Sequence, residues 1–130
     1  MNSPTSAPDS VHDSTASAAD ALRDISEVAA IEVITTAAVH LMSAAAVKCG
    51  LGDGTAAQSE AETDLDEARK LINALAGLVD AAAADIGNQH ARSLRDGLRS
   101  LQLAFREASV IPDEPGKGPG EKYTGPVRAR

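Results

Sequence analysis

The sequence predicts an all-α protein, a small antiparallel three-helix bundle with disordered N- and C-terminal tails. Three observations favour this fold class. Aromatic residues make up only 2% of the 130 residues, whereas a β-sandwich needs more aromatic residues and more turns. No proline lies between Asp9 and Ile111, so long helices are permitted there. Within that span apolar residues recur at intervals of three and four, the spacing of one helix face.

The first helix is predicted over about residues 26–49. Asp24 and Glu27 have the spacing of a capping box, and three glycines within residues 50–54 end the helix. Its apolar face carries Ile31, Ile34, Ala38, Leu41 and Ala45. A set of small residues on the same helix predicts close packing, within the chain or across a dimer interface: Ala37, Ala38, Ala44, Ala45 and Ala46.

The second helix is predicted to begin near Asp64 or Asp66. Acidic residues crowd this start, where negative charge opposes the positive end of the helix dipole. A heptad pattern follows and requires a packed helical partner: Leu65, Ala68, Ile72, Leu75, Val79, Ala82 and Ile86. Gly77 costs about 1 kcal/mol relative to alanine inside this helix, and it leaves room for a close approach.

The third helix is predicted over about residues 89–109, after Gly87 and Asn88 break the chain. One side of it is apolar: Ala91, Leu94, Leu98, Leu101, Phe105 and Ala108. Each of the three helices is about 30 Å long, and short connections pack them antiparallel.

The chain is expected to contain a disordered tail over residues 1–20, a helical domain over 21–111 and a second disordered tail over 112–130. Ser, Thr, Ala, Asp and Pro dominate the first tail, which cannot bury enough apolar surface to offset the entropy of ordering. The second tail holds four prolines and four glycines, which forbid a helix and discourage a strand.

The composition favours a cytoplasmic protein that does not contact a membrane. A net charge of -7 suits nucleic acid poorly, because phosphate contacts need clustered Lys and Arg. The single cysteine, Cys49, fits a reducing compartment, and residues 1–20 lack the apolar run of a secretory signal. The most apolar stretch, 29–51, is interrupted by Glu32, His40 and Lys48, which favours a buried helix over a membrane span.

No catalytic, cofactor-binding or metal-binding residue is predicted, so the chain is not expected to be an enzyme. His40 has no acidic or histidine partner within a helical turn of it. Cys49 lies at the negative end of a helix dipole, which disfavours a thiolate. The loop GLGDGTAAQSEAETDLDE lacks both the lysine of a phosphate loop and the alternating ligands of a calcium loop.

A stripe of arginines on the third helix is the most suggestive polar feature: Arg92, Arg95, Arg99 and Arg106. It fits contact with an acidic protein or with RNA phosphates. The alternative is a solvated face paired with Asp96 and with acids of the second helix. In the C-terminal tail, Lys122 and Tyr123 fit a segment that docks into a partner as an extended peptide, the alternative being an unbound tail.

Three runs of the sequence together resemble the domain-of-unknown-function family 1844: TTAAVHL at 35–41, DLDEARKLI at 64–72 and LRDGLR at 94–99. The resemblance covers about residues 28–108, and the ending GPGEKYTGPV is similar to that of actinobacterial members. It implies a small helical domain and carries over no catalytic residue. Because members lie near genes for a translation initiation factor and ribosomal proteins, it also implies a translation-linked role.

These observations predict a non-enzymatic helical interaction module. Its expected partner is another protein, with a homodimer as one form of that contact. The contact residues are Arg92, Arg95, Arg99, Arg106, Lys122 and Tyr123. The alternative function is a ribosome- or RNA-associated accessory factor linked to translation, and RNA is the less favoured partner because the chain is acidic.

Overall fold

The computed structural model describes residues 26–128. The tail predicted over residues 1–20 lies outside the described residues, and so does Asp24 of the predicted capping box. The chain divides into two compact units, residues 1–33 and 34–130, and each is described by itself. Of the first unit the structure describes residues 26–33, which include the first turn of helix α2.

Helix α2 runs from Ala30 to Lys48. It ends at a glycine, Gly50, whose φ of +91° is a conformation that only glycine adopts without strain. The backbone N–H of Leu51 then donates to the carbonyl of Ala46 at 2.9 Å, which satisfies a helix-end acceptor. On the predicted apolar face, Ala38 and Ala45 are fully buried and Leu41 is half-buried.

A short helix, α3, spans Ala56–Glu62 within the glycine-rich and acidic loop between the first two predicted helices. Thr55 caps it by accepting a hydrogen bond from Gln58 N at 3.1 Å. None of its residues is buried, so the sequence has no apolar periodicity there that would predict this helix. The backbone N–H of Asp64 donates to Lys48 O at 2.8 Å, and this bond joins the two ends of the loop that contains α3.

Helices α4, Leu65–Ile86, and α5, Asn88–Ala108, confirm the second and third predicted helices. They lie side by side and run antiparallel, joined at Gly87, whose φ is +88°. Asp64 caps α4 by accepting from Glu67 N at 3.2 Å. The predicted heptad of α4 is buried apart from half-buried Leu65, and on α5 only Ala108 of the predicted face is exposed.

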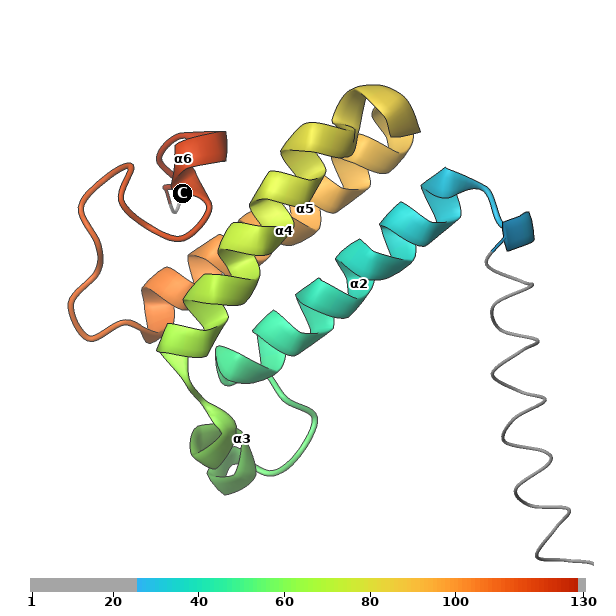
Figure 1. The fold of residues 1–130 in the computed structure, drawn as a ribbon. Helices are drawn as coiled ribbons and strands as arrows, with labels where there is room; N and C mark the ends of the chain where they lie inside the picture. The colour runs from blue at the N-terminus through green and yellow to red at the C-terminus, as the bar shows by residue number, and fades with distance from the viewer. Residues whose placement is uncertain (1–25, 129–130) are drawn as a thin grey trace, which may run out of the picture. The chain divides into compact units, whose positions relative to one another are not determined.

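Helix α2 packs against α5 through Met42, and this contact confirms the three-helix bundle. A Cβ atom placed on Gly97 would lie 2.8 Å from the sulfur of Met42 and 2.9 Å from its methyl group. The glycine in the middle of α5 therefore admits the Met42 side chain between the helices. The bundle is all-α over the described residues (Figure 1).

The prediction of a disordered tail over residues 112–130 is wrong for residues 112–128. This span, here called the C-terminal segment, returns along α4 and α5 and contains helix α6, Glu121–Thr124. Glu121 and Val127 are both buried. The glycines and prolines that argued against regular structure form turns, and the N–H groups exposed at those turns find acceptors within the fold. Residues 129–130 lie outside the described residues.

Candidate functional site

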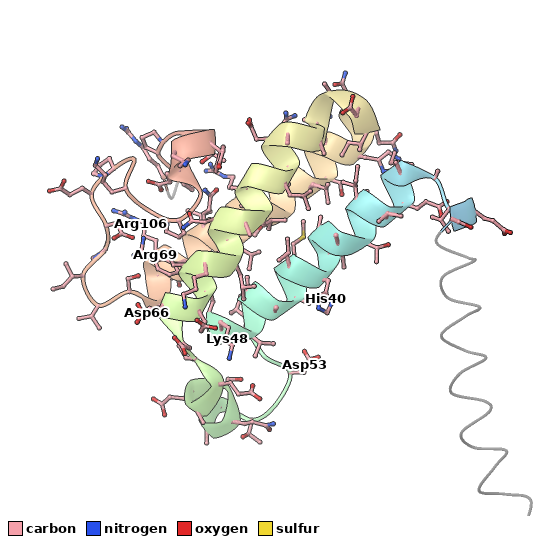
Figure 2. All side chains as sticks on the ribbon, in the orientation of Figure 1. His40, Lys48, Asp53, Asp66, Arg69 and Arg106 are labelled. Atoms are coloured by element: carbon pink, nitrogen blue, oxygen red, sulfur yellow. The ribbon has the colours of Figure 1, made fainter. Side chains whose placement is uncertain are left out.

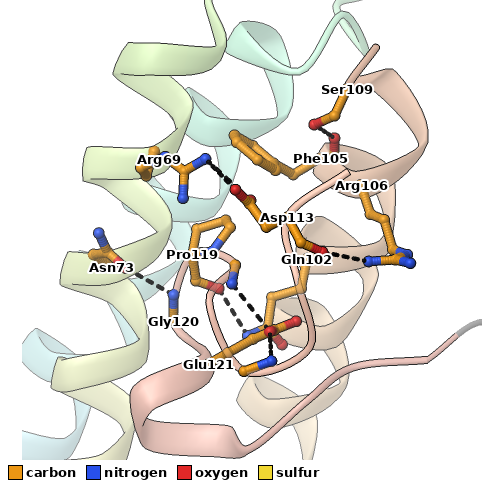
Figure 3. Close-up of polar contacts among 12 residues, drawn as sticks. Arg69, Asn73, Gln102, Phe105, Arg106, Ser109, Asp113, Pro119, Gly120 and Glu121 are labelled. Atoms are coloured by element: carbon orange, nitrogen blue, oxygen red, sulfur yellow. Dashed lines mark hydrogen bonds and ion pairs between the residues drawn. The ribbon is translucent and has the colours of Figure 1, made fainter. Parts of the chain in front are cut away.

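The C-terminal segment is anchored by two amide side chains of the long helices (Figure 3). Asn73 of α4 accepts a hydrogen bond from Gly120 N at 2.7 Å. Gln102 of α5, which is buried, donates through Nε2 to Pro119 O at 3.0 Å and to Thr124 Oγ1 at 3.1 Å. Because two of these bonds go to backbone atoms, the helices fix the path of the chain at residues 119–120.

The carboxylate of Glu121 holds the turns of the C-terminal segment together. Its Oε1 accepts from Gly116 N at 2.8 Å and from Gly118 N at 3.0 Å, and its Oε2 accepts from Val127 N at 3.1 Å. Hydrogen bonds to an ionised acceptor are stronger than those between neutral groups. One buried side chain therefore joins backbone positions before and after α6.

Arg69 of α4 fixes the beginning of the C-terminal segment. Its Nη2 donates to both carboxylate oxygens of Asp113, at 3.0 and 3.2 Å, and its guanidinium lies 4.9 Å from the ring centroid of Phe105. Arg106 of α5 donates to the backbone carbonyl of the same Asp113 at 3.2 Å. The start of the segment is thus held by one arginine from each long helix.

With the segment in place, α4, α5 and residues 123–127 enclose a half-open groove of about 340 Å³, here called the α4–α5 groove. Its apolar lining consists of Ala76, Val79, Leu98, Pro126 and Val127. Its polar lining consists of Asp80, Arg95, Arg99, Gln102, Tyr123 and Thr124.

Of the six contact residues predicted from the sequence, the fold brings three to this groove: Arg95, Arg99 and Tyr123. Arg99 donates to the backbone carbonyl of Arg128 at 2.9 Å. Within residues 26–128, Arg95 takes part in no hydrogen bond or ion pair, and the hydroxyl of Tyr123 has no hydrogen-bond partner. Gly77 of α4 is where Tyr123 comes close, since a Cβ there would lie 3.3 Å from the hydroxyl oxygen.

The other three predicted contact residues lie elsewhere. Arg92 is exposed on α5 and does not line the groove. Arg106 is engaged by Asp113, and Lys122 is exposed with its Nζ 5.1 Å from the ring centroid of Tyr123. The pairing of the stripe with Asp96 does not occur, because the ion pairs among the described residues are Arg69–Asp113 and Lys70–Glu67.

The remaining residues weighed from the sequence lie away from the groove. His40 is exposed on the side of α2 that faces away from α4 (Figure 2). Cys49 is 6% exposed, and burial raises the pKa of its thiol. In the part of the chain that the structure describes, no three His, Cys, Asp or Glu side chains are grouped so as to hold a metal ion.

Helix α2 is long and apolar enough to cross a membrane, judged by length and composition alone. Its mean hydropathy is 1.6, and 11% of its most apolar window is buried. A core helix and a signal sequence pass the same test, so this property indicates no particular environment.

The anchoring residues Asn73, Gln102 and Glu121 were not predicted from the sequence. Gln102 carried a usable signal, because it stands between Leu98 and Phe105 at the helical spacing of a core face. A polar residue at such a position requires a buried partner. Nothing in the local sequence showed that the partner is the backbone at residue 119.

The model of a protein family described as Domain of unknown function (DUF1844) matches residues 30–107, more than half of the chain. The chain belongs to this family. No curated protein and no solved structure matches it. The match includes Asn73 and Gln102 and stops before the C-terminal segment that they anchor.

Proposed function

We propose that this DUF1844 protein is a non-enzymatic, cytoplasmic interaction module that binds a protein partner in the α4–α5 groove. The observation that carries the proposal is the position of Arg95. Its guanidinium is without a partner in the described part of the chain, and Arg95 lines the same groove as the exposed apolar side chain of Pro126. An arginine beside an apolar surface is typical of the residues that dominate protein interfaces.

The proposed contact surface consists of Arg95, Arg99 and Tyr123. Arg92 is left out because it does not line the groove, and Arg106 because it is engaged by Asp113. The groove side chains are suited to binding, since a guanidinium presents several donors in a planar arrangement and a tyrosine hydroxyl both donates and accepts hydrogen bonds. The proposal includes no cofactor, and it includes no role for a membrane.

The alternative is a ribosome- or RNA-associated accessory factor. It is favoured by one observation, the unpaired state of both Arg92 and Arg95 on the exposed side of α5. Phosphate contacts by such arginines would be independent of the groove. This alternative is also consistent with the proposal that the ending GPGEKYTGPV marks an actinobacterial type of member with a translation-linked role.

The two functions are separated by affinity capture from native lysate with three full-length baits: the unaltered protein, Arg95→Glu and Arg92→Glu. A groove-bound protein partner is expected to be lost with Arg95→Glu and retained with Arg92→Glu. Equal loss with both variants, together with a steep decrease of binding with salt, would instead support RNA or the ribosome. Capture of the same proteins by all three baits would contradict both functions.

The protein partner is a second copy of the chain if the protein forms a homodimer, and light scattering of the full chain tests this. The monomer has a mass of 13.3 kDa. If the partner that fills the groove is a second copy, Arg95→Glu is expected to reduce a doubled mass to that of the monomer. If light scattering gives the monomer mass at all concentrations, the partner is a different protein and not a second copy of this chain.

A further inference from the structure

The α4–α5 groove presents hydrogen-bond donors from α5 and from the C-terminal segment. Arg99 is held by its hydrogen bond to Arg128 O at 2.9 Å, and Tyr123 lies close to Gly77 of α4 while remaining 41% exposed. Arg95 lies one helical turn before Arg99 on the same exposed side of α5. Two guanidinium groups and a hydroxyl therefore border one opening, and the Arg99 guanidinium, which is already held by a hydrogen bond, loses less entropy on binding.

The apolar part of the same groove is formed by Ala76 and Val79 of α4 and by Leu98 of α5. These three side chains are only 1–2% exposed, so they form the floor of the groove, and the apolar surface open to an occupant comes from the exposed side chains of Pro126 and Tyr123. A volume of about 340 Å³ is at the small end of ligand sites and suits one or two side chains. The groove is half open, so the rest of an occupant can lie along its edge.

From this arrangement we infer that the groove binds an acidic peptide segment in which an aliphatic side chain stands next to a carboxylate. The aliphatic side chain packs on Pro126 and the ring of Tyr123, and the carboxylate accepts hydrogen bonds from Arg95 and Arg99. This inference rests on the proposed function and adds the chemistry of the partner. A planar guanidinium matches the two oxygens of a carboxylate, which gives the contact direction as well as charge.

Asp80 decides between an acidic peptide and a nucleic acid strand. Its carboxylate lines the groove without an ion-pair partner in the described residues. Its charge opposes phosphates and peptide carboxylates alike, so the distinction lies in hydrogen bonding: Asp80 offers an acceptor to a main-chain N–H group of a peptide, whereas a phosphate group has no donor for it. Single-stranded nucleic acid also requires aromatic side chains for stacking along its path, and this groove holds one, Tyr123.

The test is a titration of the full-length, ¹⁵N-labelled protein followed by NMR. The first probe is a short peptide, acetylated and amidated at its ends, with leucine between two glutamates. The second has glutamine in place of both glutamates, the third has serine in place of leucine, and the fourth is an oligouridylate of similar length. The first peptide is expected to shift the amide signals of Val79, Leu98 and Tyr123. The glutamine and serine peptides are each expected to bind about tenfold more weakly.

Arg95→Glu and Arg92→Glu form a matched pair for the same titration. Both replace an exposed, unpaired arginine of α5, and only Arg95 lines the groove. Binding of the acidic peptide is expected to be lost with Arg95→Glu and unchanged with Arg92→Glu. Because both side chains are exposed, both variants are expected to keep the amide spectrum of the folded protein.

Three outcomes would overturn the inference: no shift at the groove signals, equal binding of the glutamine peptide, or tighter binding of the oligouridylate. The lysate experiment separates this failure from failure of the proposed function. If capture still depends on Arg95 while the acidic peptide does not bind, the groove remains the contact surface and the chemistry assigned to its occupant is wrong.

Discussion

Gln102 and Glu121 are the buried polar side chains of the described residues, and neither has a fully buried nitrogen or oxygen atom without a hydrogen-bond partner. Their partners are mainly backbone groups of the C-terminal segment. A buried polar group without a partner costs about 1–3 kcal/mol, so each of these residues favours the one chain path that supplies its partners. At the scale of single residues, this requirement orders a segment that has little apolar surface.

Glu121→Gln is expected to destabilise the protein by about 1–3 kcal/mol, because the amide nitrogen of glutamine would face a backbone N–H that now donates to the carboxylate. Urea unfolding followed by circular dichroism measures the loss. Glu114→Gln is the control, since the Glu114 side chain is exposed and bonds to nothing among the described residues. Equal stability of the two variants would show that the buried carboxylate is not what orders the segment.

Gly120→Ala is expected to release the C-terminal segment from α4. A Cβ at this position would lie 2.9 Å from Ala76 Cβ and 3.0 Å from Gln102 Nε2, and the φ of +77° adds backbone strain. Gly116→Ala adds a Cβ at a φ of +84° with 4.0 Å to the nearest atom, so it reports the strain alone. Hydrogen exchange at residues 114–127 is expected to be faster in Gly120→Ala than in Gly116→Ala, and the reverse order would contradict the packing described.

Cys49 is expected to react slowly with iodoacetamide in the folded protein. Burial hinders access and raises the pKa of the thiol, so at pH 8 a smaller fraction is ionised than in an exposed cysteine. The rate, measured by mass spectrometry, is expected to increase with pH beyond the usual thiol range and to increase sharply in urea. A native rate equal to the rate in urea would show that the end of α2 is not packed.

Among the elements, α4 and α5 were predictable because their apolar residues repeat over many turns and every repeat contacts the same neighbour. Helix α3 was not predictable from apolar periodicity, since it buries no residue and rests on the cap at Thr55. Helix α6 was excluded by a rule on proline and glycine content that holds only for longer helices. Its four residues fit between Gly120 and Gly125, both of which have positive φ.

The N-terminal cap of α4 is expected to contribute measurably to stability. Asp64→Ala removes the acceptor of the Glu67 N–H and is expected to cost about 1 kcal/mol in urea unfolding. Asp66→Ala is the matched variant, because it removes an equal charge from the first turn without removing a cap. If the two variants cost the same, the dipole and not the capping hydrogen bond accounts for the effect.

At the scale of the whole molecule, the candidate site depends on contacts between residues far apart in the sequence. Charge and helical spacing were enough to predict Arg95 and Arg99 as contact residues. Tyr123 was predicted because it is the single tyrosine of the chain and lies in the C-terminal segment. Their presence at one groove depends on the return of the C-terminal segment, which Asn73 and Gln102 hold from 47 and 17 residues away. Composition underestimates order in that segment because backbone hydrogen bonds to buried side chains replace much of the missing apolar burial.

The docking of the C-terminal segment on α4 is tested most directly by nuclear Overhauser effects in the full-length protein. The chain has one tyrosine and one phenylalanine, so the ring signals are assigned without ambiguity. Cross-peaks are expected between the Tyr123 ring and the α-protons of Gly77, and between the Ala76 methyl group and the α-protons of Gly120. Sharp, averaged Tyr123 signals without these cross-peaks would contradict the docked segment, and the α4–α5 groove would lose one of its walls.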